Sequence, residues 1–235
     1  MKTSLTLLIL MFLFGCNSKI KQDPDLVAWW SFDGNVTSIV KDQSGNNLEA
    51  KNLGAIPVDG RVGKGLKFDG KSILQVDYQP ILDSFRKGIS VMAWVKKDTA
   101  SYWNTIVSRE IDSTWSEYFG LAIVKNKPLF SVDPDGKRYI NVTAENSVQP
   151  EKWIHLAGTF DNQVFKLYVN GLLVKLGKCN SSLLFHDQNP LFIGGNSNDR
   201  NQSLVDCFKG TIDEVRLYKR ALTANEIQSV YENAQ

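Results

Sequence analysis

Residues 153–176, WIHLAGTFDNQVFKLYVNGLLVKL, contain three β-strand patterns separated by two turn signals. Asn170-Gly171 is the stronger signal, because a type I′ hairpin turn needs positive φ at both central residues and Asn and Gly tolerate it best. Alternation away from this turn predicts three apolar cross-strand pairs on one face: Val169 with Leu172, Leu167 with Val174, and Phe165 with Leu176. The hairpin should therefore have one buried face.

Asp161-Asn162 is the second turn signal, and it predicts a third strand on the same face. A turn of these two residues pairs Phe160 with Gln163, so that residues 154–160 add to the buried surface. A sheet with one apolar face needs a second layer to cover it. The rest of the chain is expected to supply that layer.

Short strand patterns separated by turn residues recur along the whole chain, about every ten residues. They cover residues 26–32, 66–68, 73–78, 89–96, 101–109, 118–125, 129–132, 138–143, 191–195 and 208–218. No helical pattern bounded by glycine interrupts them, and no repeat of fixed period appears. This arrangement predicts an all-β fold of antiparallel strands, either a two-sheet sandwich or a barrel.

The last strand pattern, residues 208–218, changes phase halfway, which predicts a β-bulge near Asp213-Glu214. After it, Thr223 and Glu226 have the spacing of a capping box. The sequence therefore predicts one short C-terminal helix, residues 224–232.

The N-terminal residues MKTSLTLLILMFLFGC have a lysine near the start and a short apolar run, which is typical of a secretory signal. The ending Leu13-Phe14-Gly15-Cys16 resembles the lipobox of bacterial lipoproteins, in which the cysteine carries the lipid anchor. That resemblance implies a signal peptide at residues 1–15, a polar leash at 16–25 and a lipid-anchored domain at 26–235, placed at the bacterial cell envelope. An ordinary signal peptide that happens to contain a cysteine is the alternative.

The composition indicates a globular chain, since 43% of the residues are hydrophobic. The formal net charge of +2 includes Lys2, so removal of the signal peptide leaves 26 − 25 = +1. No basic stripe or acidic tail appears, which makes nucleic acid a poor candidate partner.

Cys179 and Cys207 form an even pair once Cys16 is set aside. Because an exported protein meets an oxidising environment, we expect a disulfide between them. Two free, buried thiols are the alternative.

Six segments in fixed order carry a resemblance to a known family: VAWWSFDGN, DQSGNN, GRVGKGLKFDG, ISVMAWVK, EKWIHLAGTFDNQVFKLYVNGLLV and GTIDEVRLYKRALTANEI. Together they look like the LamG-like jellyroll domains of the concanavalin A-like lectin/glucanase superfamily, over about residues 26–235. The resemblance implies a two-sheet antiparallel jelly-roll sandwich. It implies no single activity, because function on such a fold depends on the site.

Asp33 and Asp213 are the candidate metal ligands. Domains of this family often hold a structural Ca²⁺ where the first and last strands meet, and such ions take carboxylate and carbonyl oxygens. A plain capping role for either aspartate is the alternative.

Aromatic and polar residues in two loop regions suggest a sugar-binding groove, because aromatic rings stack on the apolar faces of sugars. The candidate ligand-binding residues are Trp103, Trp115 and Tyr118 in or beside the span 98–118, with Asn196, Asn198 and Arg200 in the span 194–206. Alternatively, the loop aromatics fold onto the edge of the sandwich.

Glu110, Asp112 and Glu117 begin but do not complete the paired-acid motif that some enzymes of this superfamily carry on one strand face. We interpret them as solvated loop charges. His155 lies on a strand without a Ser or Cys partner that the sequence reveals, and we interpret it as structural.

The favoured function is a non-catalytic, membrane-tethered module that binds a glycan or a protein partner. A glycan-cleaving enzyme using the three acids and a structural or adhesive domain without a small ligand are the alternatives.

Overall fold

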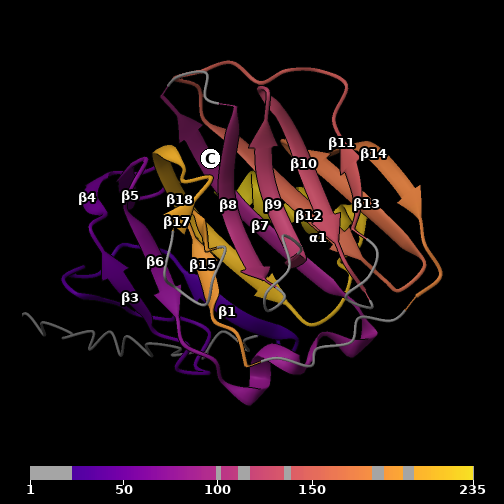
Figure 1. Ribbon diagram of the computed structural model, residues 1–235, viewed down its shortest axis with the longest axis horizontal. Helices are drawn as coiled ribbons and strands as arrows, with labels where there is room; N and C mark the ends of the chain where they lie inside the picture. The colour runs from indigo at the N-terminus through magenta and orange to yellow at the C-terminus, as the bar shows by residue number, and fades with distance from the viewer. Residues whose placement is uncertain are drawn as a thin grey trace, which may run out of the picture.

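The computed structural model describes residues 23–98, 102–110, 117–134, 139–181, 188–197 and 204–234. Two antiparallel sheets pack face to face, and one short helix follows the last strand (Figure 1). This confirms the prediction of an all-β sandwich with a C-terminal helix. Within these residue ranges, no helix is long and apolar enough to cross a membrane.

Sheet A consists of β14 (Leu172–Lys178), β13 (Val164–Val169), β12 (Ile154–Phe160), β7 (Ile89–Lys97), β18 (Lys209–Tyr218), β5 (Lys64–Asp69) and β4 (Ile56–Asp59), in that spatial order. The first strand, β1 (Leu26–Trp30), also pairs with β18. The three-stranded meander predicted from residues 153–176 therefore forms one edge of sheet A.

Sheet B consists of β11 (Ile140–Thr143), β10 (Lys127–Val132), β9 (Glu117–Val124), β8 (Trp103–Glu110), β15 (Leu191–Ile193), β6 (Ile73–Val76), β3 (Ala50–Leu53) and β2 (Ile39–Val40). A small hairpin pairs β16 (Asn196–Ser197) with β17 (Leu204–Val205). The 3₁₀ helices η1 (Pro80–Asp83) and η2 (Phe85–Lys87) precede β7, and α1 (Ala224–Asn233) ends the fold.

The Asn170-Gly171 turn is formed as predicted, with φ of 51° and 78°, and Val169 pairs with Leu172. The remaining predicted pairs are wrong. A bulge shifts the register, so that Leu167 lies opposite Lys175 instead of Val174. Because one extra residue moves the following side chains to the other face, Leu176 lies opposite Lys166 and does not join the core. Four apolar residues of β14, two of them before the bulge, are 39% to 67% exposed: Leu172, Leu173, Val174 and Leu176.

The turn at Asp161 is longer than predicted but keeps the predicted faces. Asp161 Oδ1 accepts hydrogen bonds from the backbone N–H groups of Gln163 and Val164, at 3.0 and 2.6 Å. Phe160 therefore pairs with Phe165 and not with Gln163. A shift of two residues preserves alternation, so the predicted face of β12 still lies in the core.

The core lies between the two sheets and interlocks them. Gly158 on β12 leaves room for the ring of Phe130 on β10, since an added Cβ would come within 2.2 Å of Phe130 Cδ2. Trp30 is fully buried, and its indole N–H donates to the carbonyl of Leu48 at 2.8 Å. The second layer predicted for the meander is thus sheet B.

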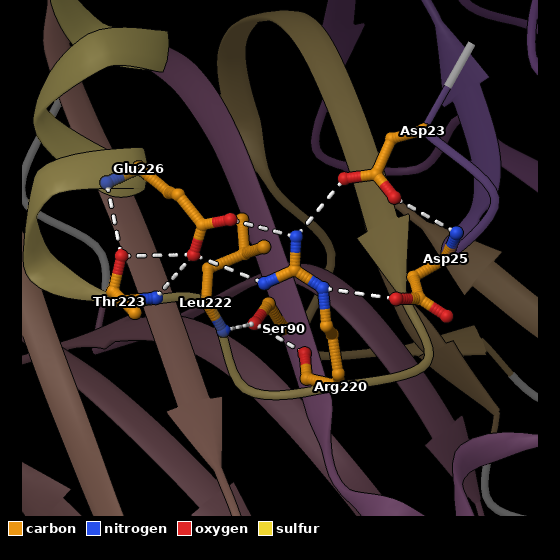
Figure 2. Close-up of polar contacts among 7 residues, drawn as sticks. All are labelled: Asp23, Asp25, Ser90, Arg220, Leu222, Thr223 and Glu226. Carbon is orange, nitrogen blue, oxygen red and sulfur yellow. Dashed lines mark hydrogen bonds and ion pairs between the residues drawn. The ribbon is translucent and has the colours of Figure 1, made fainter.

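The bulge predicted in the last strand is present, because the register of β18 shifts between Asp213 and Arg216 and Glu214 has a φ of 53°. The predicted capping box is also formed. Thr223 Oγ1 accepts from Glu226 N, and a Glu226 carboxylate oxygen accepts from Thr223 N. Figure 2 shows this cap beside Arg220, which also reaches the first described residues.

The predicted disulfide is wrong, because Cys179 and Cys207 are free thiols. Cys179 lies at the end of sheet A where β7 begins, and Cys207 precedes β18 at the end where β7 finishes. The nine residues of β7 span about 30 Å between these ends. A disulfide needs Cα atoms within about 7 Å of each other, so the fold keeps the two thiols apart.

Candidate functional site

A mainly polar row crosses the outer face of sheet B. Residues that lie directly opposite each other in a ladder share one face of the sheet. Phe119 and Val132, which are chain neighbours of two residues in this row, belong to the core, so the row lies on the opposite face. The row runs through Asn141, Ser131, Gly120, Ser108, Phe192, Gln75 and Lys51. Sheet B therefore turns hydroxyl and amide groups away from the core.

The β16–β17 hairpin lies over the middle of this row. Ser108 Oγ on β8 is 3.1 Å from the Gly195 carbonyl and 2.8 Å from Asn196 Oδ1. Beyond β17, the Asp206 carbonyl accepts from Thr105 N at 2.9 Å. The predicted residue Asn196 thus lies beside β8, and the groove between the two loop regions stays a prediction.

Glu117 is buried in this face. An added Cβ at Gly120 would lie 2.2 Å from Glu117 Oε1, so glycine makes the space that the carboxyl group fills. Ser131 Oγ donates to the same oxygen at 2.7 Å. Burial raises the pKa of Glu117 to about 7, the Ser131 hydrogen bond lowers it, and the charge of Asp206 raises it. At neutral pH a large fraction of this carboxyl group is protonated.

Tyr139 completes what we call the Glu117 cluster: Glu117, Ser131, Tyr139 and Asp206. Burial of the Tyr139 hydroxyl raises its pKa to about 12, with a further rise from Glu117 and a hydrogen bond with Ser131 that lowers it. The residue as a whole is 40% exposed. The cluster therefore combines a partly exposed tyrosine with carboxyl and hydroxyl groups that can both donate and accept hydrogen bonds.

Ser131, Tyr139 and Asp206 are absent from the sequence-based candidates. Ser131 alternates with the core residues Phe130 and Val132, which marks it as facing away from the core. No comparable signal marks Tyr139 or Asp206, because they join the cluster only through the pairing of distant strands.

Among the predicted aromatic residues, Trp103 begins β8 opposite Val124 and is half-buried. Tyr118 differs from the prediction of a ligand-binding aromatic residue, because it is 1% exposed and belongs to the core. It lies in strand β9, in agreement with the strand pattern at residues 118–125, and the Arg109 guanidinium carbon is 5.6 Å from the centre of its ring. It cannot offer its ring to a ligand. Trp115, Asn198 and Arg200 lie outside the described residues.

The three acids named from the sequence also have different outcomes in the structure. The prediction that Glu117 is a solvated loop charge is wrong, because Glu117 is a buried strand residue. Glu110 is its backbone partner across β8 and β9. Asp112 lies outside the described residues.

Asp33 and Asp213 both contact the glycine-rich loop at residues 60–64. Asp213 Oδ2 accepts from Arg61 N and Val62 N at 2.8 and 2.9 Å, and its Oδ1 accepts from Glu214 N at 2.7 Å. Asp33 Oδ1 accepts from Lys64 N at 2.8 Å. Burial raises the pKa of Asp213 to about 7.

Backbone N–H groups thus donate to both carboxylate oxygens of Asp213 and to Oδ1 of Asp33. The described part of the chain contains no group of three or more His, Cys, Asp or Glu residues placed to hold a metal ion. The geometry at these two aspartates favours loop anchoring, and the calcium site stays a prediction.

Residues 69–228 match the family model of the concanavalin A-like lectin/glucanases superfamily. Pappalysin-1 of Mus musculus is 32% identical over 105 residues, which cover 43% of this chain and 6% of pappalysin-1. The same figures hold for pappalysin-1 of Homo sapiens. The match thus spans a small part of these curated relatives.

Three solved structures share the fold. The binding domain of Paraclostridial Mosquitocidal Protein 1 has a TM-score of 0.70 at 16% identity, covering 89% of this chain and 52% of that one. The receptor binding domain of botulinum neurotoxin C/D mosaic serotype has a TM-score of 0.70 at 18% identity, covering 89% and 51%.

The third is domain 4 of AbnA, a GH43 extracellular arabinanase from Geobacillus stearothermophilus, in complex with arabinotriose. It has a TM-score of 0.69 at 22% identity, covering 88% of this chain and 98% of that one. These likenesses concern the fold, and the family model concerns the sequence over most of the domain. The chain therefore belongs to the concanavalin A-like lectin/glucanase superfamily.

Proposed function

We propose that this domain is a non-catalytic module that binds a glycan at the Glu117 cluster. The observation that carries the proposal is Tyr139, which is 40% exposed as a residue while its hydroxyl is hydrogen-bonded with Ser131 beside the buried Glu117 carboxyl group. Sugar recognition needs an aromatic surface for the ring carbons and paired donors and acceptors for the hydroxyls. A partly protonated Glu117 can both accept and donate a hydrogen bond.

The solved structures of the same fold support a binding role. Domain 4 of AbnA matches almost end to end and was solved with arabinotriose, and the two toxin domains are named as binding domains. Arabinotriose is therefore the first ligand to try. A protein partner is the alternative ligand, because one toxin domain of this fold was solved with rat synaptotagmin II.

A glycan-cleaving enzyme is the second candidate, and one observation favours it. A carboxyl group with a pKa near 7 is suited to general acid catalysis at neutral pH. Hydrolysis also needs a second carboxylate at a defined separation, about 5 to 5.5 Å in retaining enzymes. The Glu117 carboxyl group is hydrogen-bonded to the Ser131 hydroxyl, and Asp206 brings a second carboxyl group whose charge raises the pKa of Glu117, so the measurement of released sugar decides between binding and cleavage.

Attachment to a membrane at the bacterial cell envelope is part of the proposal and rests on the sequence. Cys16 would carry the lipid, and the polar residues up to 25 would hold the domain away from the bilayer. Labelling of cells with a lipid precursor should mark the wild type and not Cys16→Ser. Equal labelling of both would exclude this anchor.

The binding experiment uses the mature chain, kept soluble by Cys16→Ser, against arabinotriose and a panel of polysaccharides. Both retention and released reducing sugar are measured. We expect retention without release, weakened by Tyr139→Ala and by Ser131→Ala. Tyr102→Ala is the matched control, since Tyr102 is 65% exposed and lies against Lys125 instead.

Sugar release that disappears in Glu117→Gln would mean that the domain is a glycan-cleaving enzyme and not a binding module. Retention that Tyr139→Ala leaves unchanged would place any glycan site elsewhere on the domain.

A further inference from the structure

The outer face of sheet A carries a second cluster of nitrogen-bearing side chains, on the side of that sheet away from the core. Trp94 on β7 lies directly opposite His155 on β12 in the ladder. Arg61 comes from the glycine-rich loop and Arg216 from β18. We call these four residues the Arg61 cluster. It lies apart from the Glu117 cluster, so the inference does not rest on the proposed function.

The side chains of Arg61, His155 and Tyr231 pack around the indole of Trp94, while the Arg216 guanidinium carbon lies 4.5 Å from the centre of the Trp29 ring. The Arg61 guanidinium carbon is 4.6 Å from the centre of the Trp94 ring, and the His155 ring centre is 5.4 Å from it. Tyr231 from α1 stacks on the indole at 5.4 Å. Trp94 and His155 are 3% and 1% exposed, while Arg61 and Arg216 are half-buried. Access from solvent is therefore on the arginine side.

Hydrogen-bond partners are missing in this cluster. In the described ranges, seven buried side-chain nitrogen or oxygen atoms lack a partner, and four of them are Arg61 Nε, Trp94 Nε1, His155 Nδ1 and Arg216 Nε. Leaving such an atom unpaired costs about 1–3 kcal/mol. The indole and guanidinium nitrogens are donors only, and His155 Nδ1 can be a donor. The cluster thus gathers four unpaired nitrogen atoms, beside the Glu214 carboxylate that accepts from Arg216 Nη2.

The positive charges of this cluster also indicate a place for an anion. Within the described chain, Arg61 has no ion pair, and its charge is met only by the Trp94 ring. Arg216 pairs with Glu214 through Nη2, which leaves its Nε unpaired. The nearby Asp213 carboxylate is engaged by backbone N–H groups. Burial and the charge of Arg216 lower the pKa of His155 to about 3, so His155 is neutral at pH 7.

We propose that the Arg61 cluster binds a small oxyanion, a carboxylate, sulfate or phosphate group, held mainly by Arg61 with the Trp94 indole N–H. A guanidinium group matches the geometry of such anions, and desolvated neighbours strengthen the charge-assisted hydrogen bond. The anion is either a free inorganic ion or an acidic group carried on a glycan. An ordered water molecule is the occupant that the experiment must separate from both.

The experiment follows the indole N–H resonances of the mature chain, kept soluble by Cys16→Ser, by ¹H–¹⁵N NMR. Trp94→Phe assigns the Trp94 signal among the six tryptophans. Sulfate, phosphate and acetate are titrated against chloride at constant ionic strength. Sulfated and uronic-acid oligosaccharides are then compared with neutral arabinotriose. We expect a saturable shift of the Trp94 signal with at least one oxyanion.

Arg61→Gln should weaken this response by about tenfold, which corresponds to the loss of one charge-assisted hydrogen bond. Lys64→Gln is the matched control, because it removes the same charge from the same loop at an exposed ion pair with Asp59. If Arg61→Gln fails to fold, Arg61→Lys keeps the charge but loses the planar donor pair, and it should bind more weakly than wild type.

A response to free ions alone identifies an inorganic anion site, and a tighter response to acidic oligosaccharides identifies an acidic glycan. Both support the proposal. Three outcomes would overturn it in favour of bound water: no saturable shift, a shift shared by all the indoles, or a shift that Arg61→Gln leaves unchanged.

Discussion

Arg220 Nη2 lies 2.7 Å from Glu226 Oε1, which joins the end of the last strand to the capping box of α1 (Figure 2). The same guanidinium reaches Asp23 at 3.0 Å and Asp25 at 3.1 Å, just before β1. One arginine therefore holds three acids from the two ends of the domain. Ser90 on β7 fixes this corner, because its Oγ donates to the Arg220 carbonyl and accepts from Leu222 N.

Arg220→Met should destabilise the domain, with a loss that depends on pH. The Arg220 hydrogen bond lowers the pKa of Glu226 to about 2, from 4.5. A carboxyl group with a lowered folded-state pKa contributes stability above about pH 4.5 and loses it as the pH falls towards 2. Because these acids are more than a third exposed, we expect a loss of only about 1 kcal/mol at pH 7.

Thermal melts of both proteins between pH 7 and pH 2 check this, with the adjacent Lys219→Met as the control. The wild-type advantage should shrink below pH 4.5. A constant difference at every pH would assign the effect of Arg220 to packing.

Glu117→Gln should stabilise the domain at high pH. The folded-state pKa of Glu117 is raised to about 7, from 4.5. The stability it contributes is therefore complete below about pH 4.5 and is lost as the pH rises through 7. Each pKa unit is about 1.4 kcal/mol, so the glutamine variant should gain up to about 3 kcal/mol at pH 8 and little at pH 4.

Urea unfolding at the two pH values measures this difference, with Glu232→Gln on the exposed side of α1 as the control. An equal gain at pH 4 and pH 8 would contradict a buried, titrating Glu117.

Local signals in the sequence predict much of this fold. The Asn170-Gly171 turn, the bulge at Asp213-Glu214 and the Thr223–Glu226 cap each depend on residues close together in the chain. Each is found where the sequence places it. The resemblance of the ordered segments supplied the family and the second sheet.

The errors have a different origin, because they concern backbone irregularities and distant partners. The bulge in β14 adds a residue at Val174, and neither the adjacent Lys175 nor Gly177 is a specific signal for it. Glu117 needs the space above Gly120 and the hydroxyl of Ser131 on the next strand. Neither relation is visible until the register of sheet B is known.

Reduction should leave the stability of the domain unchanged, because Cys179 and Cys207 are free thiols at opposite ends of sheet A. Mass mapping of the alkylated, non-reduced protein should find both cysteines modified after unfolding. The double variant Cys179→Ser, Cys207→Ser should melt within a few degrees of wild type. A cross-linked peptide containing both residues would contradict this topology.

Asp213→Ala should lower the melting temperature even when calcium is absent. The variant removes the acceptor of the backbone N–H groups of Arg61, Val62 and Glu214, and an unpaired buried donor such as Glu214 N costs about 1–3 kcal/mol. A chelator should leave the melting temperature of the wild type unchanged if this anchoring is the whole role of Asp213. A calcium-dependent rise that Asp33→Asn abolishes would instead support the predicted metal site.

Gly158→Ala tests the contact that interlocks the two sheets. An added Cβ would meet Phe130 Cδ2 at 2.2 Å, and both residues are held by regular strands, so neither backbone can move aside easily. Overpacking of this kind costs about 1–3 kcal/mol. Phe130→Leu alone should also destabilise, because it removes part of a fully buried ring.

The double variant separates this contact from a general intolerance of β12. If the Phe130 ring is what the new methyl group meets, Gly158→Ala with Phe130→Leu should lose less stability than the sum of the two single changes, as residues in contact do. Urea unfolding of the four proteins gives the coupling energy. Additive losses would mean that the strain from Gly158→Ala is relieved elsewhere, and that Phe130 does not set the spacing of the two sheets.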